Sequence, residues 1–225
     1  MSTQGAQEEA RPWDAALSSA LRRPLVLASA SPRRAMLLRQ AGIEFEVRVP
    51  QIVEDADESG LPPAEVALTH ARTKAQAVAR ELWGRLVLGA DTVVVLGTQV
   101  LGKPDGPAQA RAMLQALSGR VHEVITAVAL AVGDGGGIVA EQIERTRVRF
   151  RRLSEGEIEC YVASGEPLDK AGAYGIQGRG ALLVREIEGC YFNVVGLPLS
   201  RIWDMLSSLG HGAACPAGSG AEEEE

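Results

Sequence analysis

Apolar positions along the chain follow two different periods. Nearly continuous apolar runs and strict alternation are typical of strands, whereas apolar residues three or four positions apart are typical of helices. The first kind of pattern predicts strands at Leu25–Ala28, Phe45–Val49, Leu86–Leu96, Val121–Val132, Ile138–Phe150 and Leu182–Ile187. The second kind, with Pro or a capping Ser at the start, predicts helices at Pro32–Ala41, Pro63–Trp83, Pro107–Leu117, Ser154–Ala163 and Pro198–Leu209.

These elements alternate along the chain, which indicates an α/β fold. Residues 133–137 (GDGGG) join two of the long strands and suit a hairpin turn, so at least one strand pair is antiparallel. We therefore predict a mixed twisted sheet with flanking helices.

The two ends of the chain differ in composition from its middle. The first residues are polar and acidic, and the chain closes on four glutamates. We expect residues 1–23 to be a flexible lead-in and residues 210–225 to be a disordered acidic tail. Residues 24–209 contain no linker-like break and no internal repeat, and their length suits one domain.

Charge and cysteine content narrow the class of protein. With 23 Lys and Arg against 29 Asp and Glu, the net charge is −6, and nucleic-acid-binding surfaces instead need an excess of positive charge. We expect no membrane span and no signal peptide. Cys160, Cys190 and Cys215 are widely spaced and odd in number, which favours free thiols in the cytoplasm.

The first candidate binding residues lie where a predicted strand gives way to a helix. Residues 29–34 (SASPRR) put Arg33 and Arg34 in the first helical turn, where the helix dipole favours acids rather than bases. The arginines fit that position if an anion such as phosphate binds there, with Ser29 as a further donor. The alternative is that both arginines are solvated and the serine only caps the helix.

One acidic residue interrupts the apolar strand Leu86–Leu96. An unpaired buried carboxylate is costly, so Asp91 needs a metal, a cation or several donors. Asp91 is therefore a candidate metal ligand or a general base for water, and the alternative is a structural Asp at a strand break. Gly89 would allow a ligand to approach the backbone closely.

Two lysines are further candidates. Lys74 falls within the apolar stripe of the helix Pro63–Trp83, so it either reaches the rim of the core or meets a buried anion. Lys103 lies in a Gly-Lys-Pro turn after the strand of Asp91, on a loop of the kind where functional residues concentrate. A solvated turn lysine is the alternative for Lys103.

Residues 164–178 (SGEPLDKAGAYGIQG) contain four glycines and a proline, which exclude regular structure over most of their length. Gln177 can both donate and accept hydrogen bonds, so it suits the edge of a nucleobase. An ordinary tight loop is the alternative.

Glu54 belongs to an acidic run typical of a solvated surface, and His122 is expected to be structural. The cations, the half-buried acid and the glycine-rich loop together predict a site for a polyphosphate and a divalent metal.

Six motifs, in order along the chain, resemble the Maf family: SASPRR at 29–34, GADT at 89–92, GKP at 102–104, LSGRVHEVITAV at 117–128, GEPLDKAGAYGIQG at 165–178 and NVVGLPL at 193–199. The resemblance implies a fold related to the inosine-triphosphate pyrophosphatases, with two lobes around a cleft and often a homodimer. It also implies a metal-dependent hydrolase that converts a nucleoside triphosphate into the monophosphate and pyrophosphate.

The resemblance further implies roles for individual residues. Asp91 would be the proton acceptor that activates water, and Asp91 and Glu54 would hold Mg²⁺ or Mn²⁺. Thr92 and Gln177 would contact the substrate, as in the branch that acts on dTTP and UTP. The side chains implied around the phosphate chain are Ser29, Arg33, Arg34, Lys74 and Lys103.

Two alternatives stay open. The first is a pyrophosphatase with a different base preference, such as for modified nucleotides. The second is a protein that acts by binding, as an inhibitor of septum formation and cell division, because the family has also been linked to that process.

Overall fold

A seven-stranded mixed sheet forms the centre of the computed structural model, which describes residues 22–52, 60–133 and 135–210. The strand order is β2-β1-β3-β5-β6-β7, and β4 pairs with β3 beside this path. β1 runs parallel to both β2 and β3, and the other pairs are antiparallel. The strands are β1 (Leu25–Ala28), β2 (Phe45–Arg48), β3 (Leu86–Leu96), β4 (Gln99–Leu101), β5 (Val121–Val132), β6 (Gly137–Phe150) and β7 (Val184–Glu188).

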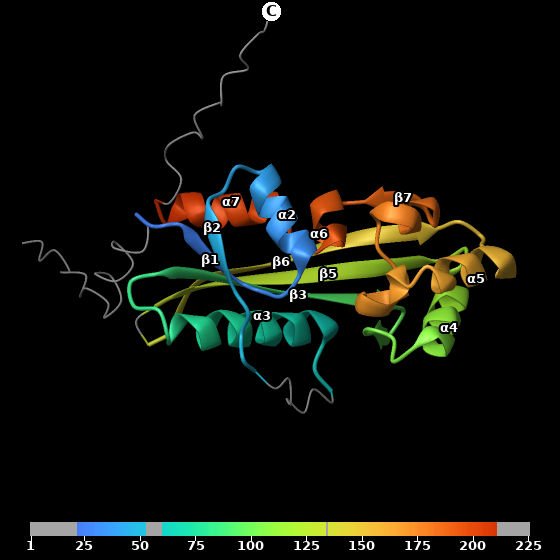
Figure 1. The fold of residues 1–225 in the computed structure, drawn as a ribbon, viewed down its shortest axis with the longest axis horizontal. Helices are drawn as coiled ribbons and strands as arrows, with labels where there is room; N and C mark the ends of the chain where they lie inside the picture. The colour runs from blue at the N-terminus through green and yellow to red at the C-terminus, as the bar shows by residue number, and fades with distance from the viewer. Residues whose placement is uncertain (1–21, 53–59, 134, 211–225) are drawn as a thin grey trace, which may run out of the picture.

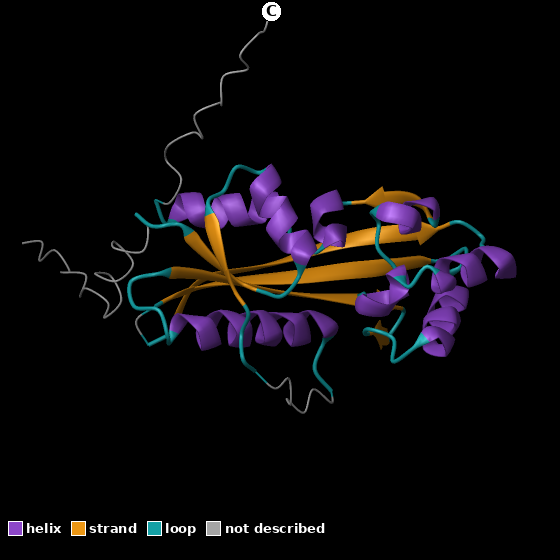
Figure 2. Ribbon diagram, viewed as in Figure 1, coloured by secondary structure: helices purple, strands orange, loops and turns teal. Residues whose placement is uncertain are grey.

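Helices cover both faces of this sheet (Figure 1). α3 lies along one face, α2, α6 and α7 lie on the other, and α4 and α5 pack at one end (Figures 1 and 2). The helices are α2 (Pro32–Gln40), α3 (Pro63–Ala79), α4 (Pro107–Leu117), α5 (Glu155–Ala163), α6 (Tyr191–Val195) and α7 (Leu199–Ser208). Three short 3₁₀ helices, η1 (Glu166–Asp169), η2 (Ala171–Ala173) and η3 (Gly178–Leu182), lie in the glycine-rich part of the chain.

β3 connects the three hydrophobic clusters of the core. Its even-numbered residues Leu86, Leu88 and Ala90 pack toward α2 and α7, and odd-numbered residues such as Val87 and Val93 pack toward α3. Further along, Val94 and Leu96 join the cluster under α4 and α5. This alternation follows from the period of two in a strand, and it puts neighbouring residues of β3 on opposite faces of the sheet.

The predicted fold class, a mixed α/β sheet with flanking helices, is confirmed. The predicted helix over Pro63–Trp83 ends earlier, at Ala79, and the following turn leads through Gly84 at φ +65°. The predicted strand at Leu182–Ile187 begins later, at Val184, because a 3₁₀ helix occupies the residues before it. The lead-in and the acidic tail lie outside the described residues, apart from residues 22, 23 and 210.

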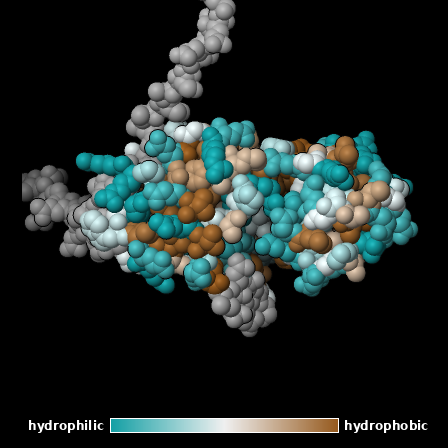
Figure 3. All heavy atoms as spheres, in the orientation of Figure 1, coloured by the Kyte–Doolittle hydropathy of each residue, from teal (hydrophilic) through white to brown (hydrophobic). Residues whose placement is uncertain are grey.

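The described surface is mixed in polarity. On the face seen in Figure 3, hydrophobic residues form small patches separated by hydrophilic ones. Over the described ranges, every helix is too short or too polar to cross a membrane.

Candidate active site

The site lies at a gap along one edge of β3. β1 pairs with β3 only as far as Gly89, and β4 takes up the same edge from Val94 onward. β5 occupies the other edge throughout this stretch. Within the described chain, residues 90–93 therefore have no strand partner on this side, just beyond the carboxyl end of a parallel strand, where ligands of open α/β sheets bind.

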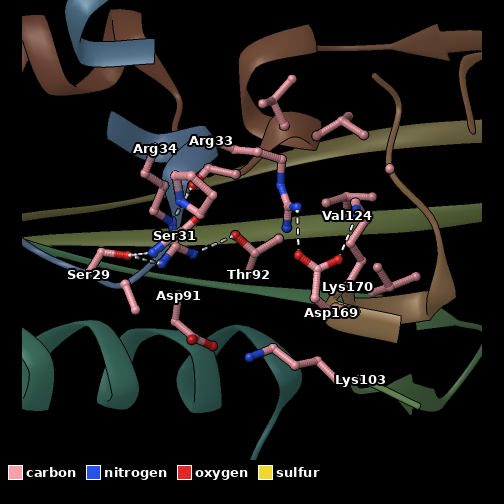
Figure 4. A pocket seen from close by; sticks show the side chains of 18 of the residues that line it. Ser29, Ser31, Arg33, Arg34, Asp91, Thr92, Lys103, Val124, Asp169 and Lys170 are labelled. Atoms are coloured by element: carbon pink, nitrogen blue, oxygen red, sulfur yellow. Dashed lines mark hydrogen bonds and ion pairs between the residues drawn. The ribbon is translucent and has the colours of Figure 1, made fainter. Parts of the chain in front are cut away.

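A cavity of about 630 Å³ opens at this gap. Its walls come from the segment after β1 with the start of α2, the segment after β2, α3, β3, β5, the loop after β4, the glycine-rich segment around η1 and η2, and the end of α6. All eight of the substrate-binding and catalytic residues predicted from sequence line it: Ser29, Arg33, Arg34, Lys74, Asp91, Thr92, Lys103 and Gln177. Figure 4 shows most of these side chains converging on a common space.

Arg34 fills the gap between β1 and β4. Its Nη1 donates to the Ala90 carbonyl at 2.8 Å, a backbone group that a neighbouring strand would otherwise satisfy. Nη1 also donates to Ser29 Oγ at 3.3 Å, Nε donates to the Gly196 carbonyl at 2.9 Å, and Nη2 donates to Thr92 Oγ1 at 3.1 Å. Arg34 therefore presents a positive charge that protein acceptors hold in one place (Figure 4).

Arg33 points to the other side of the cavity. Its Nη1 lies 3.3 Å from Asp169 Oδ2, and Asp169 Oδ1 in turn accepts from Lys170 Nζ at 2.6 Å. This chain of charges links the start of α2 to the end of η1 across the cavity (Figure 4). The Asp169 carboxylate is 64% exposed, so its attraction for Arg33 is weakened by water and a more highly charged phosphate can displace it.

Asp91 meets two residues of α3 that lie one helical turn apart. Lys74 Nζ lies 2.6 Å from Asp91 Oδ1, and His70 Nδ1 lies 3.4 Å from Oδ2. The Asp91 side chain is only 15% exposed. Burial would raise the pKa of Asp91, but the hydrogen bond from His70 and the charges of Lys74 and Arg34 outweigh it and lower the pKa. Asp91 is therefore a carboxylate at neutral pH.

Gly89 allows α3 to come this close to β3. A Cβ at this position would lie 2.2 Å from the Ala71 carbonyl oxygen and 2.7 Å from the Ala75 nitrogen. The close approach expected from sequence at Gly89 therefore exists, but its partner is the backbone of α3 rather than a ligand.

The glycine-rich segment forms the wall opposite Arg34. It folds around Glu166, whose carboxylate accepts hydrogen bonds from Tyr161 Oη and from the backbone nitrogens of Arg179 and Gly180. Ala173, with φ +57°, is the one non-glycine residue at positive φ among those described, and such strain is common beside binding sites. Where an irregular loop was expected, the structure thus has three 3₁₀ turns, and the Glu166 carboxylate joins the first of them to the third.

Some residues at the site were not predicted from sequence. His70 is the clearest case, although its place four residues before Lys74 puts both on one helix face. Asp169, Lys170 and Tyr174 lie in a segment that was singled out, but no role was given to them. Glu54, predicted as a metal ligand, lies outside the described residues.

The site offers limited but suitable ligands for a divalent metal. Nowhere in residues 22–52, 60–133 and 135–210 do three His, Cys, Asp or Glu side chains gather as a ready-made metal site. Asp91 nevertheless presents a carboxylate to a cavity rich in cations, and Mg²⁺ in nucleotide sites is commonly held by one or two carboxylates together with substrate phosphates and water. The donor set therefore fits a metal that arrives with its substrate.

Sequence comparisons with known proteins identify the family of this chain. A dTTP/UTP pyrophosphatase from Moorella thermoacetica is 54% identical over 188 residues, covering 83% of this chain and 95% of that protein. A protein of the same name from Symbiobacterium thermophilum is 52% identical over 187 residues, covering 83% and 94%. A solved structure of a HAM1 protein from Coxiella burnetii aligns with 82% of this chain and 98% of its own, at 18% identity and a TM-score of 0.45. The family described as Maf-like protein matches residues 24–209, and the chain belongs to this Maf family.

Proposed function

We propose that this chain is a nucleoside triphosphate pyrophosphatase that hydrolyses dTTP and UTP to the nucleoside monophosphate and pyrophosphate. The observation that carries this function is the single cavity in which an ionised carboxylate, Asp91, lies among arginines and lysines. The names of relatives that are about half identical over most of the chain support the same substrates.

The cations suit a triphosphate chain. Arg33 and Lys103 line the cavity with donors that can reach phosphate oxygens, and Figure 4 shows the Lys103 amine directed toward Asp91. Arg34 and Lys74 add positive charge from fixed positions. Such preorganised charges stabilise the negative charge that grows on the leaving pyrophosphate. In this proposal, Ser29 holds Arg34 by accepting its hydrogen bond, and Thr92 and Gln177 line the substrate-binding cavity.

In the proposed reaction, Asp91 orients and deprotonates the attacking water. The water oxygen forms a bond to the α-phosphorus, the bond from that phosphorus to the α,β-bridging oxygen breaks, and the water proton passes to the Asp91 carboxylate. The lowered pKa of Asp91 makes it a weak base on its own. Asp91 and Glu54 would hold Mg²⁺ or Mn²⁺, which would supply Lewis-acid chemistry that lowers the pKa of a nearby water. Lys74 and His70 keep the two carboxylate oxygens in defined directions.

The glycine-rich wall provides for recognition of the base. Gln177 offers an amide that can both donate and accept, which suits the edge of a pyrimidine. Ile176 and Val194 supply apolar surface in the same cavity. We also propose a homodimer, as in many family members, and a cytoplasmic location, which suits the free thiols of Cys160 and Cys190.

Substitution of Asp91 tests the function. Asp91→Asn keeps the size of the side chain but removes the proton acceptor, so we expect kcat for pyrophosphate release from dTTP to fall by about 10² to 10⁴ while the far-UV spectrum is unchanged. The exposed Asp204 on α7 gives a matched control, and Asp204→Asn should retain full activity. Equal rates for wild type and Asp91→Asn would refute the assigned role.

A panel of canonical and modified nucleotides with Mg²⁺ or Mn²⁺ tests the substrate. Faster release from dTTP and UTP than from purine nucleotides is expected. Preference for another base would correct the substrate, and no release from any nucleotide would favour a protein that acts by binding in cell division.

A further inference from the structure

A chain of buried hydrogen bonds runs from Arg34 into the core beneath the cavity. Arg34 Nη2 donates to Thr92 Oγ1 at 3.1 Å, and Thr92 Oγ1 lies 2.9 Å from Thr126 Oγ1. Thr126 Oγ1 donates to the Asn193 carbonyl at 3.1 Å. Thr126 and Asn193 are both 0% exposed, so these bonds form away from bulk water.

The directions of these hydrogen bonds follow from the groups involved. A guanidinium only donates, a carbonyl only accepts, and a hydroxyl has one proton. Because Thr126 gives its proton to the Asn193 carbonyl, Thr92 must give its own proton to Thr126. Thr92 then accepts from Arg34. The three bonds therefore run in one direction, from the cation to the backbone of α6, and each link polarises the next.

Asn193 fixes the far end of this chain. Its Nδ2 donates to the Val124 carbonyl at 3.0 Å and to Thr146 Oγ1 at 2.9 Å, which ties α6 to β5 and β6. The short helix α6 ends at Val195, and the carbonyl of the next residue, Gly196, accepts from Arg34 Nε. Gly196 has φ +123°, and a Cβ there would lie 3.8 Å from Arg34 Nε. Asn193 thus helps to position two of the acceptors around Arg34. One is the Gly196 carbonyl, which is positioned through the backbone of α6, and the other is Thr92 Oγ1, which is positioned through Thr126.

We propose that Thr126 and Asn193 are positioning residues for the reaction, which hold the Arg34 guanidinium in the strand gap beside Asp91 through Thr92 and Gly196. The inference deepens the proposed function and rests on it. Neither residue lines the cavity, so neither touches the substrate. Their effect reaches the phosphates only through Arg34, which the network holds in place before the nucleotide arrives.

A double-mutant cycle tests this route. Thr126→Val keeps the shape but removes the hydroxyl, and we expect kcat/KM for dTTP to fall about 10- to 100-fold. Thr126→Ser restores the hydroxyl and should recover most of the activity. In an Arg34→Lys background, which has no fork to position, Thr126→Val should cost less than about threefold further. Ser118→Ala removes a hydrogen bond from the Leu153 nitrogen, and neither residue lines the cavity, so this variant should lower the melting temperature without changing kcat/KM.

The outcomes separate the inference from the proposed function. Wild-type pyrophosphate release decides the function. The inference is tested by the non-additivity of the losses in kcat/KM that Thr126→Val and Arg34→Lys cause. The same cycle is measured in parallel on the affinity for the uncleavable α,β-imido analogue of UTP. Additive losses, or a Thr126→Val variant as active as wild type, would overturn the inference. If Thr126→Val does not fold, Thr92→Val interrupts the same chain one link earlier and must show the same non-additivity with Arg34→Lys.

Discussion

Neighbouring residues of β3 serve the site from opposite faces of the sheet. Asp91 turns toward α3, where Lys74 and His70 hold its carboxylate, and Thr92 turns toward α2 and α6, where it holds Arg34. Both reach the same cavity because no strand covers this part of the edge of β3 in the described chain. A pair of adjacent residues can therefore organise the water and the phosphate-binding cation separately.

His122 predicts a pH dependence of stability. The ring is 2% exposed, its Nε2 lies 2.7 Å from Tyr174 Oη, and burial lowers its pKa to about 4. Below about pH 6.5 the unfolded chain takes up a proton here that the folded chain refuses, so stability falls as pH falls toward 4. Between pH 7 and pH 5 the free energy of unfolding should drop by about 2 kcal/mol on this account.

Urea unfolding of wild type and His122→Gln at the two pH values measures this effect. The variant has no titrating ring, so its stability should depend less steeply on pH even if it is lower throughout. Equal pH dependence in both proteins would mean that His122 does not stay neutral in the fold.

At the scale of elements, the approach of α3 to β3 sets the distance between Lys74 and Asp91. Gly89→Ala would place a methyl group 2.2 Å from the Ala71 carbonyl oxygen, so the helix must move away from the strand. We expect a loss of about 1 to 3 kcal/mol in the free energy of unfolding, together with a large loss of pyrophosphate release as the contact between Lys74 and Asp91 opens.

Chemical denaturation and turnover of the same preparation measure both effects. Gly156→Ala on α5, where a Cβ meets nothing within 4 Å, is the matched control and should retain stability and activity. Unchanged activity in Gly89→Ala would show that the site tolerates a shift of α3.

The elements that could be predicted from sequence are those with strong local signals. Pro32, Pro63 and Pro107 each open a helix where expected, because proline suits the first turn. β4 and α6 were not predicted, since three and five residues carry little periodicity. They form because of long-range contacts, such as the bonds from Asn193 to Val124 and Thr146.

Most of the site residues could be predicted because each carries a charge or a hydroxyl at the end of an element. Thr126 and Asn193 could not be predicted in this way, because they are buried polar residues inside elements.

At the scale of the whole molecule, the cavity joins segments from Ser29 to Gly196, nearly the full length of the described chain. Its walls belong to both ends of the sheet, with α2 and α3 on one side and the 3₁₀ turns near α4 and α5 on the other (Figure 1). β3 and β5 run continuously between the two sides. We therefore expect residues 24–209 to unfold as one cooperative unit.

Binding of the uncleavable α,β-imido analogue of UTP tests this expectation. A ligand at about 100 times its Kd stabilises the folded state by about 2.7 kcal/mol, which for a protein of this size raises the melting temperature by roughly 5 to 10 °C. If the chain is one unit, calorimetry should show a single transition that moves upward as a whole, because both sides of the cavity are held by the same ligand. A second transition that stays in place with ligand would show that one side unfolds independently and that the site couples to only part of the fold.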